Sequence, residues 1–264
     1  MVIFLVALYG LIFGSFFNVV IYRLPNKMSL ANPSSHCTSC NTRLKPLDLI
    51  PVFSWLFLGG KCRYCKSKIS VRYTLVELLT SALWVAMYLK FGLTLDFIAS
   101  VILLSIMLIA AFIDLELHII PDELVVFGII TGAIIATING LTDIKLRIYE
   151  DIKWWNPLLG AVSASGILLI IAIVGYFIYK TDDAMGLGDV KIYIPIGIYL
   201  GWRMALVSLL FSVFIGAIIG ITLILFKVRK RKEGMPFGPS IALGVLMTYL
   251  VGPELLNLYL ATLM

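Results

Sequence analysis

Apolar runs of membrane-spanning length recur along almost the whole chain, and they limit what it can fold into. A helix needs about 20 mostly apolar residues to cross the hydrocarbon core of a bilayer. Eight runs approach or reach this length, at residues 1–22, 74–89, 95–113, 119–138, 157–179, 190–200, 204–226 and 241–260. They predict an all-α polytopic membrane protein with about eight transmembrane helices. The sixth run is the shortest, and Pro195 within it would remove a helix hydrogen bond and kink the helix.

Composition excludes the soluble classes of protein. Of the 264 residues, 61% are apolar even without glycine, and only 14% are charged. Soluble globular domains have about 45–50% apolar residues when glycine is included. A water-soluble enzyme, a disordered tail and a coiled coil are therefore excluded. The first run has no basic residue before it and no small-residue cleavage site after it, so it is predicted to remain as a transmembrane helix.

The distribution of Lys and Arg indicates the orientation in the membrane, because these residues accumulate on the cytoplasmic side. With the N terminus outside, 16 of the 21 cations fall in cytoplasmic segments, namely in residues 23–72, at Lys180 and Lys191, and in residues 227–232. The net charge of +6 thus follows from topology, and no nucleic-acid partner is needed to explain it. The basic run 227–232 is predicted to face the headgroups of anionic membrane lipid.

All four cysteines lie in the polar loop 23–72, as two CxxC pairs: Cys37 with Cys40, and Cys62 with Cys65. Two such pairs can place four thiolates around one tetrahedral zinc ion. A pair of disulfides is the alternative, but persistent disulfides are rare in the cytosol, where the loop is predicted to lie. The spacing also leaves redox sensing open. Because a four-thiolate site has no open coordination position, zinc is predicted to fold the loop rather than to act in chemistry.

Acidic residues near membrane boundaries are the candidates for catalysis. Such residues are costly unless they face a bundle interior, a wet cavity or the interface. The candidates are Glu77, Asp114, Glu116, Asp122, Glu123 and Asp189. Asp114 ends the third run and Asp189 opens the sixth, so the cation distribution places both at the cytoplasmic boundary. For any single aspartate, a helix cap or a contact with headgroups is the alternative interpretation.

A pair of facing carboxylates has the chemistry that peptide hydrolysis requires. Two carboxylates in a partly desolvated cleft repel each other, so the pair can share one proton. The ionised member can take a proton from water while the protonated member donates to the carbonyl oxygen or the leaving amine. Gly186 and Gly188, beside Asp189, would allow the close backbone approach of an extended peptide.

The segment Gly186, Leu187, Gly188 and Asp189, with Asp114 and Asp122 upstream, resembles the type IV prepilin peptidases. These are bilayer-embedded aspartic proteases of the GxGD class. The resemblance extends along most of the chain. It includes residues 14–25, which are similar to the family's opening motif, the paired CxxC loop, and residues 72–78 and 236–239.

The resemblance implies an enzyme that cuts the short basic leader of type IV prepilins and related pseudopilins at the cytoplasmic face, after a glycine. It also implies that Asp114 and Asp189 are the catalytic pair. The residues expected to support this pair are Gly186, Gly188, Lys191, Asp122 and Glu77. Asp122 occupies a position that the family usually keeps, but it is not the expected partner of Asp189. Glu77 is expected to orient the substrate amine or a backbone group, with an interhelical hydrogen bond as the alternative.

Many members of this family then methylate the new N-terminal amine with S-adenosylmethionine, and members with the cysteine loop commonly have both activities. The sequence has no glycine fingerprint of a Rossmann methyltransferase, and Gly59 and Gly60 are interpreted as a turn, with a cofactor contact as the alternative. The alternatives are a peptidase without methyl transfer and, from another class, a small proton-coupled transporter or assembly scaffold. The predicted divisions are the first transmembrane helix (1–22), the zinc-binding loop (23–72) and the transmembrane peptidase core (73–264). No oligomeric state is predicted.

Overall fold

The computed structural model describes residues 1–142, 145–149, 154–180, 186–227 and 235–263, and within them the chain is helical, with two isolated β-bridges and no strand. The helices are α1 (Val2–Arg23), η1 (Pro46–Asp48), α2 (Phe53–Phe57), α3 (Arg72–Phe91), α4 (Leu95–Leu117), α5 (Asp122–Leu141), η2 (Arg147–Tyr149), α6 (Asn156–Tyr179), α7 (Leu187–Leu225) and α8 (Gly238–Leu263). They form two compact units, Met1–Gly92 and Leu93–Met264. In the described chain, seven helices, α1 and α3 to α8, are long and apolar enough to cross a membrane. This confirms an all-helical, multi-pass membrane protein.

The sixth and seventh predicted runs form one element, α7, which folds back on itself. Within its 39 residues, Gly201 has a φ of 73° and a ψ of 169°, which are not helical. The Tyr193 hydroxyl donates to Ser212 Oγ at 2.8 Å, although 19 residues of straight helix would span about 28 Å. The parts of α7 before and after Gly201 are therefore two antiparallel arms. The helical angles are interrupted at Gly201, not at Pro195 where the kink was predicted.

In the first unit, α1 and α3 pack with their backbones close together. A Cβ atom at Gly10 would lie 2.6 Å from the Cα of Ser81, and one at Gly14 would lie 2.7 Å from the Cα of Glu77. Because the two glycines are four residues apart, they share one face of α1. Small residues at this spacing allow the close helix approach that stabilises membrane helix pairs. The Ser81 hydroxyl also donates to the Ala7 carbonyl at 2.9 Å.

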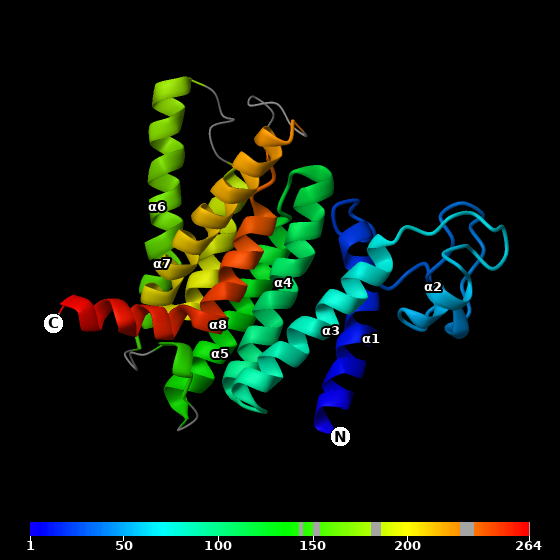
Figure 1. Ribbon diagram of the computed structural model, residues 1–264, viewed down its shortest axis with the longest axis horizontal. Coiled ribbons are helices and arrows are strands. Elements are labelled where there is room, and N and C mark those ends of the chain that lie inside the picture. The colour runs from blue at the N-terminus through cyan, green and yellow to red at the C-terminus, as the bar shows by residue number, and fades with distance from the viewer. Residues whose placement is uncertain (143–144, 150–153, 181–185, 228–234, 264) are drawn as a thin grey trace. The chain divides into compact units, whose positions relative to one another are not determined.

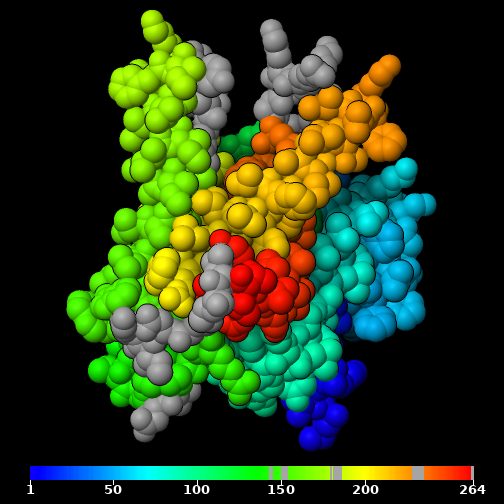
Figure 2. All heavy atoms as spheres, turned by 60° about the vertical axis from the view of Figure 1, so that its left-hand side comes forward, coloured from blue at the N-terminus to red at the C-terminus, as the bar shows by residue number. Residues whose placement is uncertain are grey.

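In the second unit, α4 is the most buried helix, and it contacts α5, α7 and α8. The unit also brings α6 against α7 (Figure 1). Where they cross, a Cβ atom at Gly160 or Gly197 would overlap the carbonyl of the other glycine, so the two backbones touch. Figure 2 shows one face of this unit, with α6, α7 and the end of α8 at its surface. The exposed side chains of α6 are apolar, Ile170 and Phe177 among them, as a lipid-facing surface requires.

Helix α8 changes direction along its length, and its C-terminal end turns away from its first part (Figure 1). Pro253 lies inside this helix, where it removes a hydrogen bond and favours a bend. The basic run preceding α8, predicted to face lipid, lies outside the described residues except for Lys227.

Candidate active site and cysteine cluster

Asp114 lies near the end of α4, and only 6% of it is exposed. The helix ends shortly after it because His118 adopts the left-handed conformation, with a φ of 54° and a ψ of 37°. The His118 N–H donates to the Asp114 carbonyl at 2.9 Å and closes the last turn. The carboxylate of Asp114 is therefore attached to a regular, buried part of the helix.

Asp189 lies in the first turn of α7 and is half-buried. Two glycines shape this turn. A Cβ atom at Gly186 would lie 3.2 Å from Asp189 Oδ2, and one at Gly188 would lie 3.2 Å from the Cβ of Ile120, in the link between α4 and α5. These contacts are tighter than ordinary packing allows. Both glycines therefore leave room, one for the aspartate and the other for the link after α4.

The carboxylates of Asp114 and Asp189, which are 75 residues apart in sequence, lie close enough for their charges to interact. A third element meets them, because the N–H of Gly238 at the start of α8 donates to Asp114 Oδ2 at 2.7 Å. The end of α4 and the beginnings of α7 and α8 thus converge on one site. The arrangement can support acid–base chemistry, since it brings two carboxyl groups together and gives one of them a fixed hydrogen-bond donor.

Asp122 and Lys191, both expected to support the pair, contact each other. Lys191 Nζ lies 2.8 Å from Asp122 Oδ1, and the two side chains are 49% and 68% exposed. An ion pair this exposed contributes little to stability. It nevertheless gives Asp122 a cationic partner outside the pair, whereas Asp114 is the aspartate that interacts with Asp189.

Glu77 accepts a hydrogen bond from a loop backbone in its own unit. Its Oε2 lies 2.7 Å from the N–H of Val52, and only 7% of Glu77 is exposed. Val52 precedes α2 and has a φ of 64°, which is an uncommon conformation for a β-branched residue. Glu77 therefore ties the cysteine loop to α3. A hydrogen bond with Ser15 of α1 also reaches Glu77, so its contacts include both a backbone group and a neighbouring helix.

Two further polar side chains hold the ends of this loop, and neither was predicted as a site residue. Arg23 is buried at the end of α1 and donates to the carbonyls of Ser29 at 2.9 Å and Pro33 at 2.6 Å. Asn18 donates to the Tyr73 carbonyl at 2.9 Å, across from α1 to α3. Their signal in the sequence is a polar residue within, or at the end of, the otherwise apolar opening segment.

The two CxxC pairs adopt the same local structure. Each is flanked by an antiparallel bridge, His36 with Arg43 and Lys61 with Lys68. In each, the residue after the second cysteine, Asn41 or Lys66, has a positive φ. Its N–H donates to the carbonyl of the first cysteine, at 2.8 Å for Asn41 and 3.0 Å for Lys66. The loop therefore presents two equivalent turns, each with its thiols on one side.

The four thiols converge, with all their sulfur atoms within 4.8 Å of one another. None of the four cysteines is in a disulfide. A tetrahedral zinc site with Zn–S bonds of about 2.3 Å has sulfur atoms about 3.8 Å apart, and Cys37 Sγ lies 3.8 Å from Cys65 Sγ. The backbone N–H groups of Ser39 and Cys40 lower the pKa of the Cys37 thiol to about 6. The Ser67 hydroxyl and N–H likewise lower the pKa of Cys65. This cluster could bind a metal ion.

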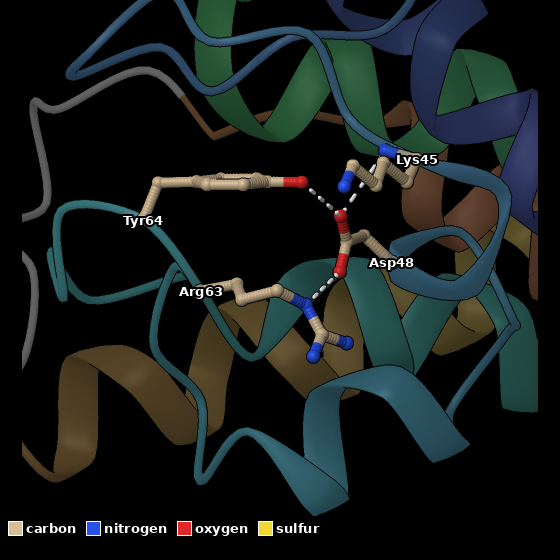
Figure 3. Close-up of polar contacts among 4 residues, drawn as sticks. All are labelled: Lys45, Asp48, Arg63 and Tyr64. Carbon is tan, nitrogen blue, oxygen red and sulfur yellow. Dashed lines mark hydrogen bonds and ion pairs between the residues drawn. The ribbon is translucent and has the colours of Figure 1, made fainter.

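Asp48 connects the middle of the loop to the second CxxC turn (Figure 3). It accepts hydrogen bonds from Arg63 Nε at 2.5 Å and from the Tyr64 hydroxyl and the Lys45 N–H at 3.1 Å each. Burial raises the pKa of the Asp48 carboxyl, but these donors outweigh it and hold the pKa below its ordinary value. Because Arg63 and Tyr64 are the two residues between Cys62 and Cys65, Asp48 fixes the turn that carries these thiols.

Comparisons with known proteins show which family the chain belongs to. Residues 8–91 match the Bacterial Peptidase A24 N-terminal domain, and residues 101–221 match the Type IV leader peptidase family. A prepilin leader peptidase/N-methyltransferase of Bacillus subtilis is 33% identical over 253 residues, which cover 96% of each chain. The chain belongs to the type IV leader peptidase family. Relatives of the same name are 32% identical in Aeromonas salmonicida, over 98% of this chain and 94% of the relative, and 36% identical in Myxococcus xanthus, over 82% and 61%. No solved structure matches the chain.

Family membership confirms the resemblance that the motifs indicated. Each of the two matches in this leader peptidase lies within one compact unit, the first inside Met1–Gly92 and the second inside Leu93–Met264. The contact of Gly238 with Asp114 was not predicted. Its signal was the motif at residues 236–239, which shows that the segment matters but not which group it touches.

Proposed function

We propose that this protein removes the leader peptides of type IV prepilins and pseudopilins, cutting after a glycine, with Asp114 and Asp189 as the catalytic pair. The observation that carries the proposal is the interaction between these two carboxylates in the second unit. It occurs in a chain that is 32–33% identical to prepilin leader peptidases over almost its whole length. One carboxylate activates water, and the other protonates the peptide carbonyl or the leaving amine.

The orientation we propose places the pair and the cysteine loop at the cytoplasmic face, with the N terminus outside. The support is the predominance of Lys and Arg in residues 23–72 and near Lys180 and Lys191. A prepilin has its leader in the cytosol and its apolar helix in the bilayer. The scissile bond then lies at the boundary where Asp114 and Asp189 are placed, and the substrate helix does not have to leave the membrane.

The decisive experiment uses the full chain in liposomes with a purified prepilin, and mass spectrometry of the product. Asp114→Asn and Asp189→Asn are each expected to leave the leader uncut. Asp122→Asn is the matched control, because it removes a nearby carboxylate that pairs with Lys191. It is expected to retain cleavage. Leader removal by either of the first two variants, or loss of removal only in the Asp122 variant, would contradict the assignment.

We further propose that Cys37, Cys40, Cys62 and Cys65 hold one structural zinc ion. The support is the convergence of four free thiols at sulfur spacings that suit a tetrahedral site. Bound zinc would cross-link the two turns of a loop that buries few apolar side chains. The purified full chain is expected to contain one zinc ion per molecule by elemental analysis. A metal-free preparation with a folded loop would argue against the site.

Methylation of the new N terminus with S-adenosylmethionine is proposed from the names of the relatives, which include N-methyltransferase. No residue is assigned to the cofactor. Gly59 and Gly60 have positive φ and form the turn after α2, and a Cβ at Gly60 would meet the Trp55 ring at 2.9 Å. The product spectrum distinguishes the two forms of the proposal. A cleaved pilin heavier by one methyl group supports both activities, and an unmodified amine supports the peptidase alone.

A further inference from the structure

The two aspartates of the proposed pair have different surroundings, and the difference begins at Gly238. This residue starts α8, and its N–H donates to Asp114 Oδ2 at 2.7 Å within a buried contact. A Cβ atom at Gly238 would lie 2.8 Å from Asp114 Oδ2 and 3.0 Å from the Cβ of Asp114. Glycine is therefore needed for the amide to reach the carboxylate. The beginning of a 26-residue helix also carries a partial positive charge.

Packing against α7 fixes the start of α8 in this place. A Cβ atom at Gly216 of α7 would lie 3.0 Å from the Phe237 ring and 3.3 Å from Ser240 Oγ. Phe237 and Ser240, on either side of Gly238 in sequence, therefore lie directly against α7 at Gly216. The donor therefore does not depend on a flexible side chain. It is part of the scaffold, and it holds its direction before any substrate arrives.

The surroundings of Asp189 differ. In the part of the chain that the structure describes, no backbone or side-chain donor forms a hydrogen bond with its carboxylate. Asp189 is half-buried, and its strongest electrostatic partner is Asp114. A hydrogen bond from an N–H favours the charged form of a carboxylate, whereas the like charge acts on both members of the pair equally, so the donor at Asp114 decides between them. The shared proton of the pair therefore belongs on Asp189.

We propose that Gly238 is a positioning residue that keeps Asp114 ionised as the general base, so that Asp189 carries the proton and is the general acid. This assignment rests on the proposed function and gives the two aspartates different roles. The sequence does not show which aspartate is the base and which is the acid, whereas the hydrogen bond from α8 is made to Asp114.

The assignment fixes the path of each proton. The water oxygen bonds to the peptide carbonyl carbon while one water proton moves to Asp114 and the proton of Asp189 moves to the carbonyl oxygen. The resulting diol then collapses. Asp114 gives its proton to the amide nitrogen, the C–N bond breaks, and one hydroxyl proton of the diol returns to Asp189. Asp114 is again ionised and Asp189 again protonated, so the cycle closes.

Other ionisable groups near the two aspartates do not change which of them carries the proton. His118 lies just beyond the end of α4, and a positive charge there also favours ionised Asp114. Helix α5 begins with Asp122 and Glu123, and Asp122 is paired with Lys191 of α7. The first turn of α8 contains no acidic or basic residue, so what α8 contributes to the pair is the Gly238 amide.

The first test replaces the Gly238 amide by an ester, which removes the N–H but keeps the glycine shape. In the pH dependence of kcat/KM for leader cleavage by the full chain, the acid limb is expected to move to higher pH by about one to two units. Gly238→Ala is expected to move the same limb. The control is Gly166→Ala, whose methyl would meet Val162 of its own helix at 3.9 Å. It is expected to move neither the acid limb nor the alkaline limb. A shift of the alkaline limb instead, or of no limb, would overturn the assignment.

The second test uses the unaltered full chain without substrate and needs no cleavage. A diazoacetyl ester with Cu(II) esterifies protonated carboxyl groups, and peptide mapping by mass spectrometry locates the label. Asp189 is expected to be labelled at least tenfold more than Asp114. Preferential labelling of Asp114, or no label on the half-buried Asp189, would overturn the assignment even if both aspartates proved essential for cleavage. Conversely, cleavage by the Asp114→Asn or Asp189→Asn variant would refute the pair itself, whatever the labelling pattern.

Discussion

Glu77→Ala should release the cysteine loop from α3 without unfolding the helix. The variant removes the acceptor of the Val52 N–H, a 2.7 Å hydrogen bond to a side chain that is only 7% exposed. A hydrogen bond to a carboxylate contributes about 1.5–3 kcal/mol, and little of this is lost to solvent at such burial. With a central value of about 2 kcal/mol, local opening at Val52 becomes roughly thirtyfold more frequent.

Hydrogen exchange of the full chain, followed by mass spectrometry of the peptide containing Val52, measures this opening directly. Glu77→Gln keeps a neutral acceptor, so its exchange should rise only about fivefold, as for a hydrogen bond of about 1 kcal/mol. Thr80→Ala is the matched control, because the Thr80 hydroxyl donates to the Val76 carbonyl of its own helix. Unchanged exchange at Val52 in Glu77→Ala, or an equal rise in the Thr80 variant, would refute the reasoning.

Three further predictions concern the cysteine loop and the second unit. Acidification to well below pH 6 should release zinc, because protons must compete with the bound ion for the Cys37 thiolate, whose pKa without metal is about 6, and a fluorescent zinc indicator measures the release. Asp48→Asn should weaken zinc binding about tenfold or more in a chelator competition, because the Asn amide cannot replace the charge that faces Arg63. Unchanged affinity would show that the second CxxC turn keeps its structure without Asp48. Gly160→Ala should lower the thermal midpoint by several degrees, whereas Gly140→Ala, whose methyl meets no atom, should not.

The parts of the fold that local chemistry determines could be predicted from the sequence. Hydropathy located each long helix of the described residues, because the bilayer sets the length of an apolar segment. The CxxC spacing predicted the thiol cluster for a similar reason, since each pair forms its own turn. Hydropathy could not show that two runs belong to one element, because the reversal at Gly201 needs no polar loop. A single glycine with positive φ is sufficient.

The contacts that order the site join residues far apart in the chain, and periodicity carries no information about them. Gly238 and Asp114 are 124 residues apart, and Glu77 and Val52 are 25 apart. In each pair, one partner is a backbone N–H, which every residue except proline possesses. A sequence motif can mark such a segment as important. Only the folded backbone shows which amide points at which carboxylate.

The arm of α7 that carries Asp189 is held by contacts at three positions along its length, so the proposed pair has a rigid support. At the turn, Asn156 Oδ1 accepts from the Trp202 N–H at 3.0 Å and holds the reversal. In the middle, the backbones of α6 and α7 touch at Gly197, and Tyr193 bonds across to Ser212. A catalytic pair needs its groups held within about half an ångström of the productive geometry. Substitutions at these distant contacts should therefore lower kcat for cleavage without touching either carboxylate, because they move the arm on which Asp189 stands.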